Sequence, residues 1–422
     1  MSRSIAIVGA GAAGLTTAWS LKKRGYSNVK LFERRDRVGG KCLTVDIDNR
    51  NYELGAVIVG RTTYEVVNTL IQEFGLNLTP METTTLLDSS RGGSVGKLGL
   101  VFNFLLKYRG PLKRFLKEVD AGPAFSEPGF LGFAPEQFGY TFAEWAKREN
   151  IEPLVELFAP IYTGFGYGYL DQISAPQFLK IYDQERIDKT FSRKPGDPPA
   201  MFTLDEGYQG LWEKVAAEQN VQLNASIRKI TRDDRVTITT EQGEERFDAL
   251  VLACPLHAIR DVLDLDAEEA PLYNKATYLD YQTITADVDG LGPEGLMFMV
   301  DNMTSDRAGH LVCGYRRWEE SPTWALYALS DGSYDDPTII ERVKSDLEAV
   351  GAKLTKVHRH DKWDFYPHVT PEDFRAGFYP NLEAKQGQRS TYIVGEIMGA
   401  ACVESTSNYA HQLVMKHFTD HS

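Results

Sequence analysis

The feature that most constrains the fold is a glycine-rich turn that directly follows the first apolar segment. Residues 4–8 read SIAIV, an apolar and β-branched run that predicts a buried parallel strand. The six residues after it, GAGAAG, have the GxGxxG spacing and contain Gly9, Gly11, Ala13 and Gly14. Apolar residues at helical spacing then continue up to Gly25, which predicts a helix ending at that glycine.

This order of strand, turn and helix is typical of a βαβ unit that binds a dinucleotide. The first glycine allows the tight turn, the second lets the backbone approach a pyrophosphate, and the third lets the helix pack on the strand. The helix N-terminus presents free N–H groups and the positive end of its dipole to the phosphates. A second strand at 29–32 is followed by Glu33, whose carboxylate can accept hydrogen bonds from an adenosine ribose. The sequence therefore predicts a Rossmann-type domain in an α/β fold.

A second GxGxxG spacing occurs at residues 290–295, but a strand pattern follows it and Pro293 interrupts it. Without a helix N-terminus, this segment cannot present N–H groups to a pyrophosphate. We interpret it as a loop between strands and expect no second site for NAD(P)H.

Composition excludes several function classes. The 422 residues suffice for two or three domains, and the net charge of 46 − 59 = −13 argues against a nucleic-acid partner. The four cysteines are far apart without a CxxC pair, so we expect neither a zinc site nor a disulfide framework. No metal site is expected at His358, His360 and His368, since no carboxylate has matching spacing. No apolar run is long enough to cross a bilayer, and the chain begins directly with a strand, so we expect a cytoplasmic protein.

Two stretches after the nucleotide unit resemble flavoproteins of the amine oxidase superfamily. They are RRDRVGGKC at 34–42 and YELGAVIVG at 52–60. In that superfamily the first stretch follows the diphosphate and ribityl chain, and the second passes along the flavin ring. Lys41 stands where an Arg is more usual, and it keeps the charge without the bidentate fork. The resemblance assigns to FAD the residues Arg34, Gly39, Gly40, Lys41, Gly55, Ala56, Val57 and Ile58.

Two later stretches complete the resemblance. A β-meander and strand between 221 and 255 implies that adenine lies near the backbone amide of Ile227. STYIVGEIMG at 390–399 places Glu396 at the ribityl hydroxyls. The helix that follows directs its N-terminus, at Val403 and Glu404, toward flavin N1 and O2, where its dipole favours the reduced flavin. FAD is therefore the expected cofactor.

The cofactor-binding stretches are spread over the chain, which predicts a discontinuous FAD-binding domain of the flavin amine oxidase type. We expect this domain at residues 1–80, 205–265 and 386–422. Residues 81–204 are expected to form a helical insert or cap, and residues 266–385 a substrate-binding β-sheet domain.

A run of rings and glycines, YTGFGYGYLD at 162–171, contains no acid or base beside the rings. Together with residues 300–322, 365–379 and 395–399, it resembles the bacterial polyenoic fatty acid isomerases, and the similarity covers nearly the whole chain. In that family the flavin takes a hydride from a CH₂ between two double bonds and returns it to another carbon. The resemblance implies that Phe165 and Tyr167 form a wall over the flavin, because ring faces stabilise a cation by about 0.5–2 kcal/mol each. Tyr162 and Tyr169 either extend this wall or fill the core.

The sequence departs from that family at one position that bears on the substrate. An Arg that holds the substrate carboxylate there would fall near Thr84 and Thr85 here, and this chain has no Arg at that place. Arg61 and Arg91 lie nearby in the sequence without matching. The substrate is therefore either a polyunsaturated fatty acid or a related lipid-like molecule that is less charged or carrier-bound.

Two other functions remain open. One is an FAD-dependent oxidase or desaturase, although the strand at 281–288 lacks the Lys that holds a water near N5 in many amine oxidases, and Lys275 is the nearest candidate. The other is a non-catalytic FAD-bound protein that binds a lipid or a partner.

The segment between Lys97 and Lys117 carries six basic residues with apolar residues between them. The favoured interpretation is a pair of insert helices with solvated basic faces. The alternative is peripheral contact with an anionic membrane, from which a lipid is taken.

Overall fold

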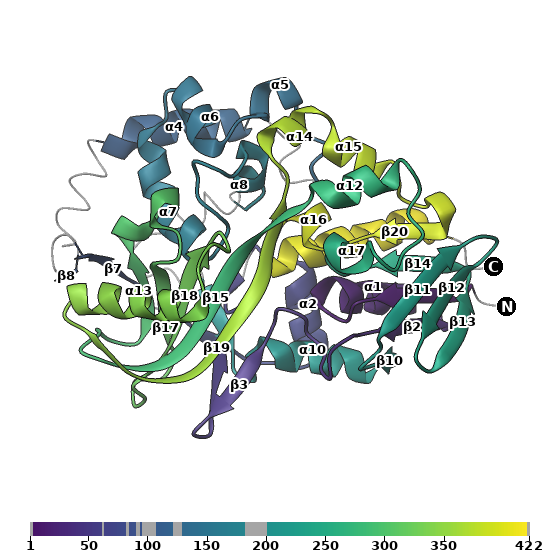
Figure 1. Ribbon diagram of the computed structural model, residues 1–422, viewed down its shortest axis with the longest axis horizontal. Coiled ribbons are helices and arrows are strands. Elements are labelled where there is room, and N and C mark those ends of the chain that lie inside the picture. The colour runs from purple at the N-terminus through teal and green to yellow at the C-terminus, as the bar shows by residue number, and fades with distance from the viewer. Residues whose placement is uncertain are drawn as a thin grey trace.

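The computed structural model describes residues 3–60, 63–81, 84–89, 93–94, 107–120, 129–181 and 201–419. In Figure 1 the N- and C-terminal segments lie together at one end, a long twisted sheet occupies the other, and a group of helices covers the top. Within the described residues, no helix has the length and apolar character needed to cross a bilayer.

A five-stranded parallel sheet forms the nucleotide-binding side. Its order is β10 (Val221–Gln222), β2 (Val29–Phe32), β1 (Ile5–Val8), β14 (Ala249–Leu252) and β20 (Thr391–Ile393). The central strands β1 and β14 are buried throughout, as expected for a parallel sheet covered on both faces. Segments from the beginning, middle and end of the chain thus share one sheet, and the α/β class predicted from the sequence is confirmed.

The helices beside this sheet include the one predicted after the glycine-rich turn. Helix α1 (Ala12–Lys23) packs against α17 (Val403–His417), α10 (Gly207–Ala217) and β2. Helix α17 also contacts α2 (Val66–Glu73) and α16 (Glu396–Gly399). Helices α1 and α17 are therefore neighbours that pack against each other (Figure 1).

Three smaller sheets accompany the parallel sheet. The meander consists of β11 (Ile227–Arg232), β12 (Val236–Thr240) and β13 (Gly243–Phe247). A hairpin pairs β3 (Thr44–Ile47) with β4 (Arg50–Glu53), and a third sheet has the order β5 (Val59–Gly60), β9 (Met201–Leu204) and β6 (Leu78–Pro80).

The second large sheet has seven strands. Its order is β19 (Lys353–His368), β15 (Thr277–Asp289), β18 (Thr323–Ser330), β17 (Leu311–Arg316), β16 (Gly295–Met299), β7 (Thr84–Asp88) and β8 (Gly93–Ser94). Helix α13 (Asp336–Ala349) buries Ile339, Val343 and Leu347 in the apolar cluster on one face. The loop at 290–295 joins β15 to β16, so the second GxGxxG is indeed a loop between strands.

The position of β7 corrects one expectation. Residues 81–204 were expected to form a helical insert, but residues 84–88 pair in parallel with β16, and β9 belongs to the third small sheet. Leu87 of β7 is buried in the same cluster as α13, so packing on the seven-stranded sheet decides the conformation of this segment.

Short helices make up the insert. They are α4 (Arg109–Asp120), α5 (Pro135–Phe138), α6 (Phe142–Arg148), α7 (Pro153–Gly164) and α8 (Ala175–Ile181). They pack through aromatic rings, of which Phe142 and Phe178 are stacked with centroids 3.8 Å apart. The other helices of the described residues are α11 (Leu256–Ile259), α12 (Glu269–Lys275), α14 (Pro371–Arg375), α15 (Phe378–Glu383), η4 (Val300–Asn302), η5 (Ser305–Arg307) and η6 (Gln388–Ser390).

Helix α4 contains residues 109–117 of the basic segment, residues 107–108 directly precede it, and residues 97–106 lie outside the described residues. Its apolar side chains Leu112, Phe115 and Val119 are buried inside the insert, and Lys113 and Arg114 are exposed. The described part therefore agrees with an insert helix that has a solvated basic face.

Candidate active site

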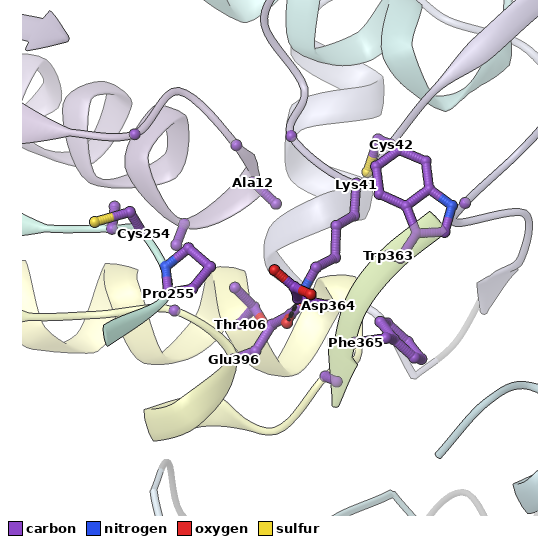
Figure 2. Close-up of a pocket in the computed structure, with 18 of the residues that line it drawn as sticks. Ala12, Lys41, Cys42, Cys254, Pro255, Trp363, Asp364, Phe365, Glu396 and Thr406 are labelled. Carbon is purple, nitrogen blue, oxygen red and sulfur yellow. Dashed lines mark hydrogen bonds and ion pairs between the residues drawn. The ribbon is translucent and has the colours of Figure 1, made fainter. Parts of the chain in front are cut away.

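A cavity of about 710 Å³ lies between the parallel sheet and the seven-stranded sheet. Figure 2 shows that its lining comes from the α1 turn, the Lys41 loop, the β14 end, β19 and the α16–α17 region. Among its lining residues are the predicted Gly9, Gly11, Ala13, Glu33, Arg34, Gly39, Gly40, Lys41, Gly55, Ala56, Val57, Ile58, Phe165, Tyr167, Ile227, Glu396 and Val403.

At the nucleotide end, the Glu33 carboxylate is fixed by backbone N–H groups. Its Oε2 accepts from Ala10 N at 2.8 Å and its Oε1 from Arg35 N at 2.9 Å. The two glycine-bearing loops touch, because Gly11 and Gly39 form a bridge and a Cβ on Gly40 would lie 3.0 Å from Gly11 Cα. This cradle has backbone on both sides and the α1 N-terminus beside it, which suits a diphosphate.

Two predicted residues do not line the cavity. A Cβ on Gly14 would lie 1.9 Å from Gly9 O, so this glycine allows the helix to pack on the turn. The Glu404 carboxylate accepts from the N–H groups of Glu65, Val66 and Val67 at 2.9, 3.0 and 2.9 Å. Its side chain therefore caps α2, whereas the expectation for Glu404 concerned the helix N-terminus at the start of α17.

The backbone segment that the resemblance places along the flavin ring is held by the seven-stranded sheet. The Tyr327 hydroxyl donates to Glu53 O at 3.0 Å. Trp363 Nε1 and Thr283 Oγ1 donate to Leu54 O at 2.8 and 3.1 Å. Three side chains from separate strands thus fix the residues directly before Gly55, which leads into the cavity lining.

Lys41 and Glu396 form an ion pair inside the cavity (Figure 2). The Lys41 ammonium also lies 5.4 Å from the centre of the Phe365 ring. The other lysine of the lining, Lys362, pairs with Asp336. Lys275 pairs with Asp373 at 2.7 Å and is not among the lining residues. In the described part of the chain, each lysine of this cavity therefore has a carboxylate partner.

Stacked rings form one wall of the cavity. Tyr281 and Tyr327 have centroids 5.6 Å apart and ring planes 9° apart. Phe365 stacks on Tyr281 at 5.3 Å and on Tyr167 at 6.0 Å, and Phe165 lines the same cavity. We call these five residues the aromatic wall.

The glycine in the middle of the aromatic run allows Tyr281 to approach. Gly166 has φ +81°, and a Cβ there would lie 2.8 Å from the Tyr281 ring. The Tyr281 hydroxyl donates to Gly164 O at 2.9 Å, which anchors the ring to this run. Tyr162 and Tyr169 fill the core instead, because they are 0% and 2% exposed and neither lines the cavity.

Sequence reasoning did not assign Tyr281, Tyr327 and Phe365 to the site. They come from β15, β18 and β19, and their neighbourhood depends on sheet register rather than on a local motif. The available signal was the stretch at 365–379, which contributes to the family resemblance and begins with Phe365.

Burial keeps two thiols and two phenols of the lining protonated. It raises the pKa of the Cys42 and Cys254 thiols to about 12, and it raises the pKa of Tyr281 and Tyr327 well above the ordinary value. Neither a thiolate nor a phenolate is therefore available from these four residues at neutral pH.

The N-terminus of α17 borders the same cavity through Cys402 and Val403. Cys402 is the N-cap residue and makes no side-chain capping hydrogen bond, so the first N–H groups of the helix have no side-chain cap. This end of the cavity can stabilise negative charge.

The chain matches the family described as flavin containing amine oxidoreductase over residues 12–286, and it belongs to that family. The family binds FAD, which agrees with the glycine cradle, the ribose acid and the two helix N-termini of the cavity. These residues fit the cofactor that the sequence predicts.

Among individual proteins, the chain is similar to the CLA-producing fatty acid isomerase from P. acnes. The structures share 26% sequence identity, cover 99% of both chains and superpose with a TM-score of 0.91. The resemblance to fatty acid isomerases is thus confirmed. A putrescine oxidase structure, at 18% identity and a TM-score of 0.73 over 100% of both chains, shares the fold.

Similar sequences include oxidases and desaturases. The putative flavin-containing monoamine oxidase AofH of Mycobacterium tuberculosis (strain H37Rv) is 25% identical over 288 residues, which are 65% of this chain. Zeta-carotene desaturase of Synechocystis is 26% identical over 312 residues, again 65% of this chain. The matches span 61% and 62% of the length of these two relatives.

Proposed function

We propose that this protein is an FAD-dependent double-bond isomerase that acts on a polyunsaturated fatty acid or a related lipid-like substrate. Bound FAD would supply an acceptor that takes a hydride and can return it. The observation that carries the proposal is the aromatic wall, a set of stacked rings in a cavity whose lysines are paired and in which Cys42, Cys254, Tyr281 and Tyr327 are neutral.

The aromatic wall suits a substrate that loses a hydride. Loss of a hydride from a CH₂ between two double bonds leaves a delocalised cation, and each ring face stabilises such a charge by about 0.5–2 kcal/mol. The rings also exclude water, which would otherwise capture the cation. The Glu396 carboxylate neutralises Lys41, so this ammonium does not oppose a cation beside Phe365.

The charge states of the lining favour hydride removal over proton removal. A general base needs a free acceptor near the reacting carbon. Cys42, Cys254 and the buried tyrosines of the wall, Tyr281 and Tyr327, retain their protons, and Glu396 is engaged with Lys41. The residues of the wall therefore orient the substrate and shield it, without exchanging a proton with it.

A second candidate is an FAD-dependent oxidase or desaturase, which the similarity to AofH and to zeta-carotene desaturase favours. Such an enzyme would start with the same hydride removal and pass the electrons to oxygen or another acceptor. The two candidates differ in whether the hydride returns to the substrate.

The test is anaerobic and aerobic turnover of FAD-loaded protein with linoleic-type acids, their esters and carrier-bound forms. The proposal predicts conjugated-diene absorbance in the absence of oxygen, without peroxide. A substrate with deuterium at the CH₂ between the double bonds should give a product of unchanged mass with deuterium on another carbon. Stoichiometric peroxide with loss of deuterium would show an oxidase, and no spectral change of the flavin with any lipid would show a non-catalytic protein.

A further inference from the structure

Helix α10 contacts the cofactor loops from outside the cavity. It packs against β3, β4 and β9, and none of its residues is among the described residues that line the cavity. Tyr208 and Trp212 of this helix are both fully buried. They are four residues apart and therefore lie on the same face of the helix. Each of them makes a hydrogen bond to a residue of the cavity lining.

Tyr208 holds both ends of the segment that the family resemblance places along the flavin ring. Its backbone N donates to Glu53 Oε1 at 3.1 Å, and its hydroxyl donates to Ile58 O at 3.2 Å. Residues 55–58, which lie between these two contacts or at their end, all line the cavity. A single buried residue thus fixes the start and the end of this segment.

Trp212 holds the other loop, which the resemblance places along the diphosphate and ribityl chain. Its Nε1 donates to Cys42 Sγ at 3.2 Å, and Cys42 lines the cavity directly after Lys41. One turn earlier in the helix, Gln209 N donates to Thr44 Oγ1 at 3.2 Å, and Gln209 Oε1 accepts from Thr44 N at 3.3 Å. The loop is therefore attached to α10 at two places.

We infer that Tyr208 and Trp212 are positioning residues, which set the placement of the two cofactor loops relative to each other and through it the affinity for FAD. Both loops are attached to one face of one helix, so a shift of α10 moves them together. The inference rests on the FAD site of the proposed function and not on isomerisation itself. Hydride transfer depends on a fixed orientation of the reacting groups, so the same contacts would also support the proposed reaction.

The main test is Tyr208→Phe, which keeps the ring and the backbone N–H and removes only the bond to Ile58 O. Reconstitution of apoprotein with FAD, followed by flavin fluorescence, should give a dissociation constant about fivefold higher, which corresponds to the loss of one hydrogen bond. The visible absorption bands of the bound flavin should also shift. Trp212→Phe removes the bond to Cys42 and should act in the same direction, and Tyr208→Phe keeps the inference testable if that variant does not fold.

Tyr169→Phe is the matched control. The Tyr169 hydroxyl also donates to a backbone carbonyl, Leu329 O at 2.9 Å, but Tyr169 is buried in the core and is not among the lining residues. Both variants should lose similar stability in urea unfolding, whereas Tyr169→Phe should keep the FAD affinity and the flavin spectrum of the parent protein.

The inference is overturned if Tyr208→Phe binds FAD as tightly as the parent protein with an unchanged spectrum. It is equally overturned if Tyr169→Phe changes the affinity and the spectrum to the same extent as Tyr208→Phe. Neither measurement needs a lipid, so a failure of the proposed isomerisation is distinguishable from a failure of this inference.

Discussion

The hydroxyl oxygens of Tyr162 and Tyr366 lie 2.6 Å apart in the protein interior. Tyr366 donates to Gln177 O at 3.0 Å, so Tyr162 is the donor within the pair. Tyr366 has φ +48°, a conformation that bulky residues rarely adopt, and its ring lies 5.5 Å from the ring of Tyr167. The pair therefore holds a strained backbone next to the aromatic wall.

The stability losses from removing the two hydroxyls of this pair should not add, because the hydroxyls belong to one network. Tyr366→Phe removes both the acceptor of the Tyr162 hydroxyl and the donor to Gln177 O, and we expect a loss of about 1–3 kcal/mol in the free energy of unfolding. Adding Tyr162→Phe should lower the stability further by less than the effect of Tyr162→Phe alone, because the two groups share one network. Urea unfolding of the two single variants and the double variant measures the coupling. Additive losses would show that the hydroxyls act independently.

Shortening the aromatic wall should slow turnover without removing the cofactor. Phe365→Leu keeps an apolar side chain but removes the ring face between Tyr281 and Tyr167, so we expect a decrease in kcat of about tenfold, equivalent to one cation–π contact. Rapid-mixing kinetics of flavin absorbance and the FAD content of the purified variant are the measurements. Phe374→Leu is the control, since Phe374 is a buried ring that is not among the lining residues. Equal losses in both variants would assign the effect to general packing.

The Lys41–Glu396 pair gives a prediction about cofactor affinity. Lys41→Met leaves the Glu396 carboxylate without its cation inside the cavity, which should weaken FAD binding by about tenfold or more. Lys362→Met is the matched control, because Lys362 lines the same cavity but pairs with the half-exposed Asp336. Reconstitution of apoprotein with FAD, followed by flavin fluorescence, gives both dissociation constants. The role assigned to the Lys41 charge is wrong if the two variants bind FAD equally well.

The sequence predicted the nucleotide-binding half in detail because its signals are local. Gly9 and Gly14 lie within six residues, and each has a separate steric reason to be glycine: Gly9 has φ +105°, and a Cβ on Gly14 would lie 1.9 Å from Gly9 O. The aromatic wall was predicted only in part, since Tyr281 and Phe365 become neighbours through the pairing of β15 with β19. Register between distant strands is set by the whole sheet, and no spacing in a single sequence reports it.

Side-chain direction is a second property that the sequence does not report. Glu404 follows the predicted helix N-terminus, and its place in the sequence does not show whether its carboxylate faces the cofactor or a neighbouring helix. Three backbone N–H groups at the start of α2 determine the direction of the Glu404 carboxylate, because they give it more hydrogen bonds than one ligand contact would.

The buried Glu53 carboxyl should make stability depend on pH in a defined window. Burial raises its pKa from 4.5 to about 7, and the Arg317 charge and the hydrogen bonds from Tyr208 N and Thr44 Oγ1 only partly oppose this. Between these two values the folded protein keeps a proton that the unfolded chain releases. The contribution of Glu53 to the free energy of unfolding is therefore fully present below about pH 4.5 and is lost as the pH rises through about 7.

Glu53→Gln should remove this contribution, since the amide does not titrate and has nearly the same shape. Relative to Glu53→Gln, the parent protein should lose on the order of 3 kcal/mol of stability between pH 4.5 and 7.5, as a shift of this size implies. Urea unfolding at several pH values, with both proteins saturated with FAD, measures the difference between the two curves. Groups with lowered pKa, such as Asp248 and Asp266, have the opposite slope and cancel in this difference because both proteins contain them. Parallel curves would mean that Glu53 is ionised throughout the window, and Arg317 would then hold it as a charged pair.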